Sequence, residues 1–394
     1  MKSPQLLHEP VTPADSSALS TWRDRWLLWR DRLVATPGFR RRAAAFVLTR
    51  PIARRRSREL FDLVAGFVYS QVLLACVRLR VFELLAEGPQ QISTLAPRLG
   101  LAPDAALRLL EAAVSLRLVE RRANDRFGLG PLGAPMVGNA GLAAMVEHHA
   151  ALYADLRDPV ALLRGETDGA ALAAYWPYAG ATLPAAVADE RVAAYSALMS
   201  ASQPLVAEQV LAAYDFGRHR CLLDVGGGEG AFIASVAAQA PRLRLMLFDL
   251  PAVAARARSA LQRQGLQARV EVHGGDFLSD ALPQGADLAS LVRVIHDHDD
   301  ARAMAILRAV HRALPVGGTL LLAEPMAGTV GAEPMGAAYF GFYLLAMGRG
   351  RPRSQGELRS MLHAAGFGAV RELPTAMPLQ TRLLQARVNT ASKM

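Results

Sequence analysis

From Cys221 onward the chain alternates short apolar strands with helical segments, and this alternation constrains its fold more than any other feature. Strands joined by single helices form mostly parallel sheets with helices on both faces. We therefore predict an α/β, doubly wound domain over residues 201–394. Its expected strands are CLLDVG, LRLMLFDL, ARVEVHGGDF, ADLASLVRVI, GGTLLLAEP and two short strands after Gly366.

The segment ahead of this domain predicts a winged helix. Helices at Ile92–Leu99 and Asp104–Leu116 precede a hairpin formed by Leu118–Arg122 and Arg126–Leu129. The second helix is mostly apolar and rich in alanine, so it offers few side chains that could read base edges. We expect it to pack against protein, inside a mostly helical domain that covers residues 61–200, and we expect no nucleic-acid partner.

Positive charge is concentrated at the N-terminus. Residues 1–60 contain 13 Lys or Arg against 5 Asp or Glu, in a chain whose net charge is +9. Trp22, Trp26 and Trp29 lie on one face of a helix predicted in this basic arm. Such a helix suits a membrane interface. It equally suits packing on the protein's own body or on a second subunit, and both alternatives stay open.

The cysteine count favours a reducing, cytoplasmic compartment. Cys76 and Cys221 are the only cysteines, and two residues build neither a disulfide framework nor a zinc cluster. The N-terminus has no apolar leader segment. The most apolar early stretch, Phe61–Val77, carries Asp62 and Gln71 and is shorter than a membrane span, so we expect a buried helix there.

A glycine-rich turn follows the first strand of the C-terminal domain and has the sequence Asp224-Val225-Gly226-Gly227-Gly228-Glu229-Gly230. Gly226 and Gly228 let the backbone approach a ligand closely. Dinucleotide-binding dehydrogenases share such turns, so the glycines alone decide little. Asp224 is placed to hold the ammonium group of a methionine-like ligand.

Three further residues at strand ends complete a predicted nucleoside site. Asp249 ends the second strand, where it can accept hydrogen bonds from ribose hydroxyls. The third strand ends in Asp276 and Phe277, which suit the amino group and the ring of adenine. Acidic residues at three successive strand ends favour a ligand site over simple turns, because ligands bind at this edge of such sheets. Arg293, after the fourth strand, is expected to close over the cofactor.

The fourth strand runs into Ile295-His296-Asp297-His298. A histidine at this edge can take a proton from a hydroxyl group while its oxygen attacks a methyl carbon, and His296 is our candidate general base. Two alternatives remain: His296 and His298 with their neighbouring aspartates could hold a metal ion, or His296 could be structural.

The motifs DVGGGEG, FDLP, GGDF, VIHDHDD, LLLAEP and AAGF occur in the order seen in class I O-methyltransferases of the plant and bacterial type, which the chain resembles over roughly residues 60–390. The resemblance implies S-adenosylmethionine as cofactor, no metal, a Rossmann-like catalytic domain, and a homodimer formed through the winged-helix domain. It also implies that His296 is the base and that Glu324 orients it. Pro352 stands where the family has a second glutamate, which leaves Glu324 and Asp297 to hold the imidazole.

The substrate is predicted from apolar segments and from a second resemblance. Met326–Met347 and Leu142–Tyr178 contain few charges, which suits a long apolar substrate and equally suits ordinary helix packing. Residues 31–89 are similar to the hydroxyneurosporene (demethylspheroidene) O-methyltransferases of purple phototrophic bacteria. The similarity implies methylation of the tertiary 1-hydroxyl of an acyclic hydroxycarotenoid, with membrane contact through residues 1–60. The alternatives are a phenolic or polyketide substrate, an inactive winged-helix regulator, and a membrane-docked scaffold.

Overall fold

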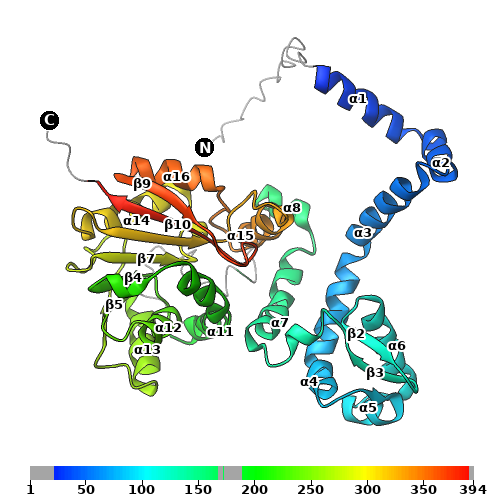
Figure 1. Cartoon of the computed structure of the whole chain (residues 1–394), viewed down its shortest axis with the longest axis horizontal. Helices are drawn as coiled ribbons and strands as arrows, with labels where there is room; N and C mark the ends of the chain where they lie inside the picture. The colour runs from blue at the N-terminus through cyan, green and yellow to red at the C-terminus, as the bar shows by residue number, and fades with distance from the viewer. Residues whose placement is uncertain (1–21, 167–171, 173–188, 390–394) are drawn as a thin grey trace, which may run out of the picture. The chain divides into compact units, whose positions relative to one another are not determined.

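The computed structural model describes residues 22–166, 172 and 189–389 (Figure 1). The chain divides into two units, Met1–Leu73 and Leu74–Met394. The predicted lining segment Leu142–Tyr178 lies partly outside the described residues.

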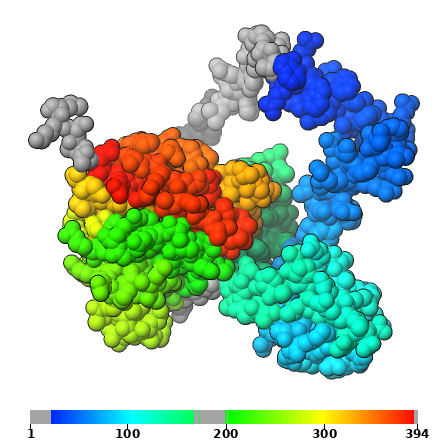
Figure 2. All heavy atoms as spheres, in the orientation of Figure 1, coloured from blue at the N-terminus to red at the C-terminus, as the bar shows by residue number. Residues whose placement is uncertain are grey.

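The first unit is built from helices with almost no core. Helices α1 (Trp22–Ala35) and α2 (Pro37–Ala45) contain no buried residue, and α3 (Arg50–Arg78) begins in this unit. Figure 2 shows the atoms of α1 and α2 as a slender arm. The helix predicted to carry the tryptophans is present. It exposes more than half of the surface of each of them, Trp22, Trp26 and Trp29.

The expectation that Phe61–Val77 is a short buried helix is wrong. The stretch belongs to α3, which has 29 residues and exposes a run of large apolar side chains: Leu60, Phe61, Leu63, Val64, Phe67 and Val68. By length and composition alone α3 could cross a membrane, a test that core helices of soluble proteins also pass. The prediction failed because an apolar run has the same composition whether it fills the chain's own core or contacts another molecule.

The second unit begins with the predicted winged helix. Its helices are α4 (Val81–Ala86), α5 (Ile92–Leu99) and α6 (Pro103–Ser115), and its strands are β1 (Gln90–Gln91), β2 (Val119–Arg122) and β3 (Arg126–Leu129). The strands form an antiparallel sheet in the order β1-β3-β2. Asn124 and Asp125 both have positive φ, as a tight hairpin turn requires.

A helical segment follows and leads to the C-terminal sheet. It contains η2 (Ala134–Met136), α7 (Ala140–Asp155), α8 (Pro159–Arg164), α11 (Asp189–Ala213) and η4 (Phe216–Arg218). Helix α7 packs along α11, and α11 in turn packs on the first helix after the glycine-rich turn.

The C-terminal sheet has the predicted doubly wound form. Its seven strands lie in the order β6-β5-β4-β7-β8-β10-β9. All pairs from β6 to β8 are parallel, and β10 is antiparallel to both neighbours. The strands are β4 (Cys221–Val225), β5 (Arg244–Asp249), β6 (Val270–Gly274), β7 (Leu288–Val292), β8 (Thr319–Glu324), β9 (Phe367–Leu373) and β10 (Arg382–Val388).

Helices cover both faces of this sheet (Figure 1). One core cluster joins the sheet to α14 (Asp300–Ala313) and α16 (Gln355–Ala364), and the other joins it to α11, α12 (Ala231–Gln239) and α13 (Pro251–Arg263). Strand order reverses between β4 and β7, and ligands of such folds bind in the crevice outside the carboxyl ends at that point. The glycine-rich turn and the His296 segment both begin there.

Candidate active site

The glycine-rich turn between β4 and α12 forms the floor of a cavity. Gly226 and Gly228 have φ of +70° and +59°, a region that favours glycine. A Cβ atom on Gly226 would also lie 2.8 Å from a methyl carbon of Val294. Asp249, at the end of β5, accepts hydrogen bonds from the backbone N–H of Gly228 (2.8 Å) and of Leu250 (2.7 Å).

Five of the seven predicted cofactor residues line this cavity: Gly226, Gly228, Asp249, Phe277 and Arg293. The structure does not bring Asp224 or Asp276 to the part of its wall formed by described residues. The Asp276 carboxylate accepts instead from the backbone N–H of Leu278 at 2.9 Å.

Asp224 is buried beneath the glycine-rich turn. One carboxylate oxygen accepts a hydrogen bond from the Ser290 hydroxyl at 2.6 Å, and the other has no partner among the described residues. Burial raises the pKa of this carboxyl to about 7, against the opposing effect of the Ser290 hydrogen bond. Its contact with an ammonium group therefore stays a prediction. Asp249, aligned by two N–H groups on the cavity wall, is the better placed carboxylate.

Sequence reasoning missed a wall of the cavity that comes from α11. Met199, Ser200 and Gln203 lie on it, and no motif marks them, because tertiary packing alone brings this helix to the turn. Leu250 and Val253 were also missed. They flank Asp249 at the start of α13, where the strand-to-helix boundary could have indicated them.

The cavity fits a nucleoside-containing sulfonium cofactor. Its floor is backbone of a turn in which Gly226 and Gly228 have positive φ, a carboxylate stands at the end of β5, and Phe277 offers an aromatic ring. These are the features that a methionine moiety, a ribose and an adenine require together.

The candidate base lies on a short turn, η5 (Ile295–Asp297), between β7 and α14. Glu324, the last residue of β8, holds this turn with both carboxylate oxygens. One oxygen accepts from the backbone N–H of Val294 (3.0 Å) and Ile295 (2.7 Å), and the other bonds Nδ1 of His296. The predicted contact between His296 and Glu324 is thus present, with both side chains buried.

Asp297 contacts the other side of the same ring. Its carboxylate oxygen lies 3.1 Å from Nε2 of His296. Burial lowers the pKa of His296, but the Asp297 and Glu324 carboxylates outweigh this effect and the net pKa is raised. Burial raises the pKa of Asp297 to about 7, partly offset by His296. The imidazole therefore stands between two carboxylates, and a proton is readily shared across the Nε2 contact.

His298 packs against an aromatic ring. Its ring meets Phe277 edge to face at a centroid distance of 5.4 Å, and burial lowers its pKa to about 4. Within the described residues, no group of three or more His, Cys, Asp or Glu side chains is arranged to hold a metal ion.

A second, smaller cavity lies beside His296. Its wall includes His148 of α7 together with Tyr339, Phe340 and Tyr343, which come from the π-helix η6 (Met335–Phe340) and from α15 (Gly341–Ala346). π-Helical turns often occur at functional sites. These four residues belong to the two apolar segments that were expected to contact the substrate.

The histidine and tyrosine side chains at the aromatic part of this wall are paired and uncharged at neutral pH. The ring nitrogens of His148 and His149 lie 2.8 Å from the hydroxyls of Tyr343 and Tyr339, respectively. Burial lowers the pKa of His148 to about 4 and raises that of Tyr339 to about 12. The aromatic side of this cavity is therefore uncharged, whereas Arg293, His296 and Asp297 also line it and carry its ionisable groups.

Arg293, Met199 and Asp297 line both cavities. The Arg293 guanidinium donates to the hydroxyl of Ser202 at 2.8 Å and contacts the sulfur of Met199 at 3.2 Å. The expected closure of Arg293 over the cofactor remains a prediction, and its position between the two cavities is compatible with it.

This chain matches two known domain families and several known proteins. Residues 153–368 match the O-methyltransferase domain, and residues 61–139 match the O-methyltransferase dimerisation domain. The demethylspheroidene O-methyltransferase of Cereibacter sphaeroides is 46% identical over 351 residues, which are 88% of this chain and 91% of the relative. That of Rhodobacter capsulatus is 44% identical over 338 residues, 85% of this chain and 83% of the relative.

A solved structure shows the same fold. Human N-acetylserotonin methyltransferase in complex with S-adenosylmethionine has a TM-score of 0.69 and 24% identity, and the match covers 85% of this chain and 98% of that one. The resemblance, the fold class and the cofactor expected from the sequence are confirmed, and the dimerisation domain indicates a homodimer. The chain therefore belongs to the S-adenosylmethionine-dependent O-methyltransferases.

Proposed function

We propose that this enzyme methylates the tertiary 1-hydroxyl of an acyclic hydroxycarotenoid, of the hydroxyneurosporene or demethylspheroidene type, in the synthesis of spheroidene or spirilloxanthin. The observation that carries the proposal is the uncharged aromatic wall of the cavity beside His296, formed by His148, Tyr339 and Tyr343. An apolar polyene end with one hydroxyl group suits such a lining. The names of the two relatives, at 46% and 44% identity, support the same substrate class.

The chain's own residues provide position and proton transfer. The cofactor, when bound, supplies an activated methyl group. The Glu324 carboxylate accepts the Nδ1 hydrogen of His296, which directs Nε2 toward the proton to be removed. A tertiary alcohol is a weak acid, so we assign His296 the removal of its proton late in the transfer. Asp297 shares that proton across its 3.1 Å contact with Nε2.

The test is a turnover assay with labelled S-adenosylmethionine. The enzyme is given detergent-dispersed 1-hydroxyneurosporene, a plain phenol, or no acceptor. Label in the carotenoid alone supports the proposal. Label in the phenol alone would replace the substrate by a phenolic or polyketide one. No label in either acceptor, with cofactor binding intact, would refute the carotenoid assignment and favour a non-catalytic role such as that of a regulator or scaffold.

His296→Ala tests the base in the same assay. We expect turnover to fall about 10²- to 10⁴-fold, the usual contribution of a general base. Cofactor affinity should stay at the wild-type value, because the described wall of the cofactor cavity does not include His296. A parallel loss of cofactor affinity would contradict the assigned role.

We also propose that residues 1–60 place a cytoplasmic enzyme on the cytoplasmic face of the inner or photosynthetic membrane. Exposed tryptophans on a basic helix support this, with Arg30 lying over the ring of Trp26 at 5.7 Å. In this proposal the predicted borders assign membrane contact to residues 1–60, dimerisation and part of the substrate lining to 61–200, and most of the cofactor site to 201–394. Met199 and Tyr339 cross this division, because Met199 also lines the cofactor cavity and Tyr339 lines the cavity beside His296.

Flotation with anionic vesicles tests the arm. We expect deletion of residues 1–60 to abolish flotation, and substitution of Trp22, Trp26 and Trp29 by alanine to weaken it. Exchange of exposed Val330 for alanine, in the catalytic domain, is the matched control and should change nothing. Unchanged flotation of the deletion variant would refute the membrane role.

A further inference from the structure

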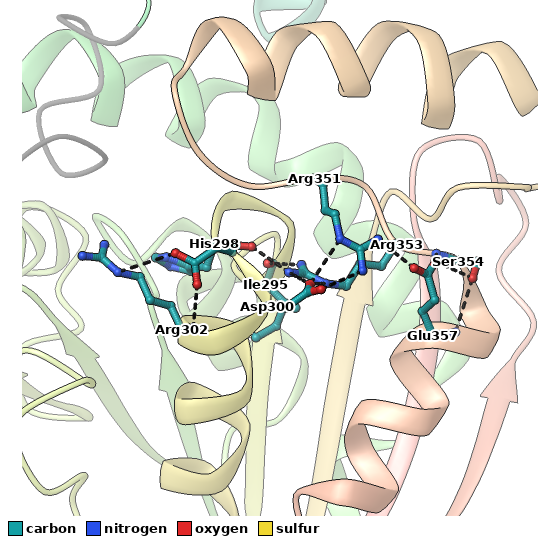
Figure 3. Close-up of polar contacts among 9 residues, drawn as sticks. Ile295, His298, Asp300, Arg302, Arg351, Arg353, Ser354 and Glu357 are labelled. Carbon is teal, nitrogen blue, oxygen red and sulfur yellow. Dashed lines mark hydrogen bonds and ion pairs between the residues drawn. The ribbon is translucent and has the colours of Figure 1, made fainter. Parts of the chain in front are cut away.

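The Arg353 side chain is buried, with 1% of its surface exposed. Its guanidinium lies beside Ile295, His298 and Asp300, which flank His296 in the sequence (Figure 3). It donates to the carbonyl oxygen of Ile295 at 2.8 Å and to that of His298 at 2.7 Å. It also contacts one oxygen of the Asp300 carboxylate at 2.7 and 3.0 Å. A buried charge is tolerated only where such partners are present. Every contact of this guanidinium is therefore directed at the turn or at the helix that follows it.

These bonds hold backbone groups of the turn that Glu324 does not bind. Glu324 binds backbone N–H groups at the entrance of η5, and Arg353 binds carbonyl groups at its first residue and just past its end. The intervening carbonyl of His296 accepts from the backbone N–H of Arg351 at 2.9 Å. The segment that carries Arg353 thus follows the turn along its length.

The same segment is tied to the strand that bears Glu324. The carbonyl oxygen of Arg353 accepts from the backbone N–H of Ala327, three residues beyond Glu324, at 2.9 Å. Gly350 packs so closely against the turn that a Cβ atom there would lie 2.3 Å from the carbonyl oxygen of His296. The backbone around His296 and the backbone just after Glu324 are therefore both bonded to the same short segment, which carries Arg353.

We propose that Arg353 is a positioning residue for His296: it fixes the backbone of the catalytic turn and so aims the imidazole at the substrate hydroxyl. Pro352 contributes no carboxylate to the ring, so the carboxylate contacts of the imidazole come from Glu324 and Asp297, and Phe340 packs against the ring edge to face. The hydrogen bonds from Arg353 to the backbone of the turn add a further constraint on the ring's position. The planar guanidinium can reach two carbonyls and a carboxylate at once, which an ammonium group on a flexible stem cannot reproduce.

The test compares Arg353→Met and Arg353→Lys with a matched control, Arg269→Met. Arg269 also donates to two backbone carbonyls, those of Ala237 (2.9 Å) and Ala240 (3.0 Å), but these lie outside the turn that carries His296. We measure kcat, the cofactor dissociation constant and the melting temperature of the full-length enzyme. Displacement of a catalytic group by about 1 Å can cost about 100-fold in rate.

We expect Arg353→Met to lower kcat about 10- to 100-fold and to weaken cofactor binding by less than that, since Asp297 and His298 of the same turn also line the cofactor cavity. Arg353→Lys should recover part of the rate. Arg269→Met should lower the melting temperature and leave kcat unchanged. A fall in kcat of less than about fivefold for Arg353→Met, an equal loss of cofactor affinity, or the same fall in kcat for Arg269→Met would each overturn the inference. Where Arg353→Met does not fold, Arg353→Lys is judged by the same limits.

The inference rests on the proposed function with His296 as base, so His296→Ala is assayed beside these variants on whichever acceptor is turned over. Full activity of His296→Ala would refute the proposed base. An inactive His296→Ala with a fully active Arg353→Met would refute only the role of Arg353.

Discussion

Replacement of Glu324 by glutamine tests the catalytic turn with the smallest change in shape. The amide keeps an oxygen that can accept from the backbone N–H groups of Val294 and Ile295, at 3.0 and 2.7 Å in the native enzyme. Its NH2 group then faces Nδ1 of His296, where the native carboxylate accepts a hydrogen bond. The ring must turn its unprotonated Nδ1 toward the amide and carry its hydrogen on Nε2, so the nitrogen that should accept the substrate proton becomes a donor.

The expected loss in kcat follows from two effects, a lost hydrogen bond and a wrong tautomer. A hydrogen bond to a charged group contributes about 1.5–3 kcal/mol, which corresponds to roughly 10- to 150-fold in rate if it stabilises the imidazolium that forms during transfer. An imidazole held in the wrong tautomer has cost about 10⁴-fold in a triad enzyme. We therefore expect kcat of Glu324→Gln to fall about 10²- to 10⁴-fold.

The assay is single-turnover methyl transfer at saturating cofactor, with the cofactor dissociation constant measured separately. That constant should not change, because Glu324 does not belong to the described wall of the cofactor cavity. Glu111→Gln, which removes an exposed ion pair with Arg121 in the winged helix, is the control and should retain wild-type kcat. A kcat for Glu324→Gln within about threefold of wild type would refute the role of the Glu324 carboxylate in orienting the base.

Three further predictions concern other parts of the enzyme. Asp297→Asn removes a carboxylate that raises the pKa of His296. Because the base works in its unprotonated form, the rising limb of the kcat/KM–pH profile should move to lower pH. A limb that does not move would argue against the contact between Asp297 and His296. Asp249→Asn should weaken cofactor binding by calorimetry about 10- to 100-fold, since the carboxylate is aligned on the cavity wall; unchanged affinity would remove Asp249 from the site. Leu110→Ala, at a fully buried position of α6, should cost about 2–5 kcal/mol in denaturant unfolding, whereas exposed Leu132→Ala should cost little.

The sheet could be predicted because its strands are local features. Strands β4 and β7 are buried at every position, as continuous apolar runs between turn signals require. The hairpin of the winged helix could also be predicted, from its polar turn. The same local logic located His296 and Glu324, since both follow strands whose ends meet at one edge.

Features set by packing could not be predicted. The side chain of Asp224 points beneath the turn toward Ser290, a direction that spacing along a strand does not determine. Met199 and Gln203 reach the cofactor cavity only because α11 packs on α12. The exposure of Phe61 and Phe67 on α3 likewise depends on what else contacts that helix.

The wall shared by the two cavities has a consequence for how such an enzyme can diverge. Met199, Arg293 and Asp297 face both cavities, so a substitution there alters the cofactor and the acceptor together. The described residues His148 and Tyr343 line only the cavity beside the base and contact each other from separate segments. Substitutions on α7 and α15 can therefore change which acceptor is preferred without changing the residues that line the cofactor cavity. We expect directed evolution toward a new acceptor to collect its first productive changes at that pair of segments.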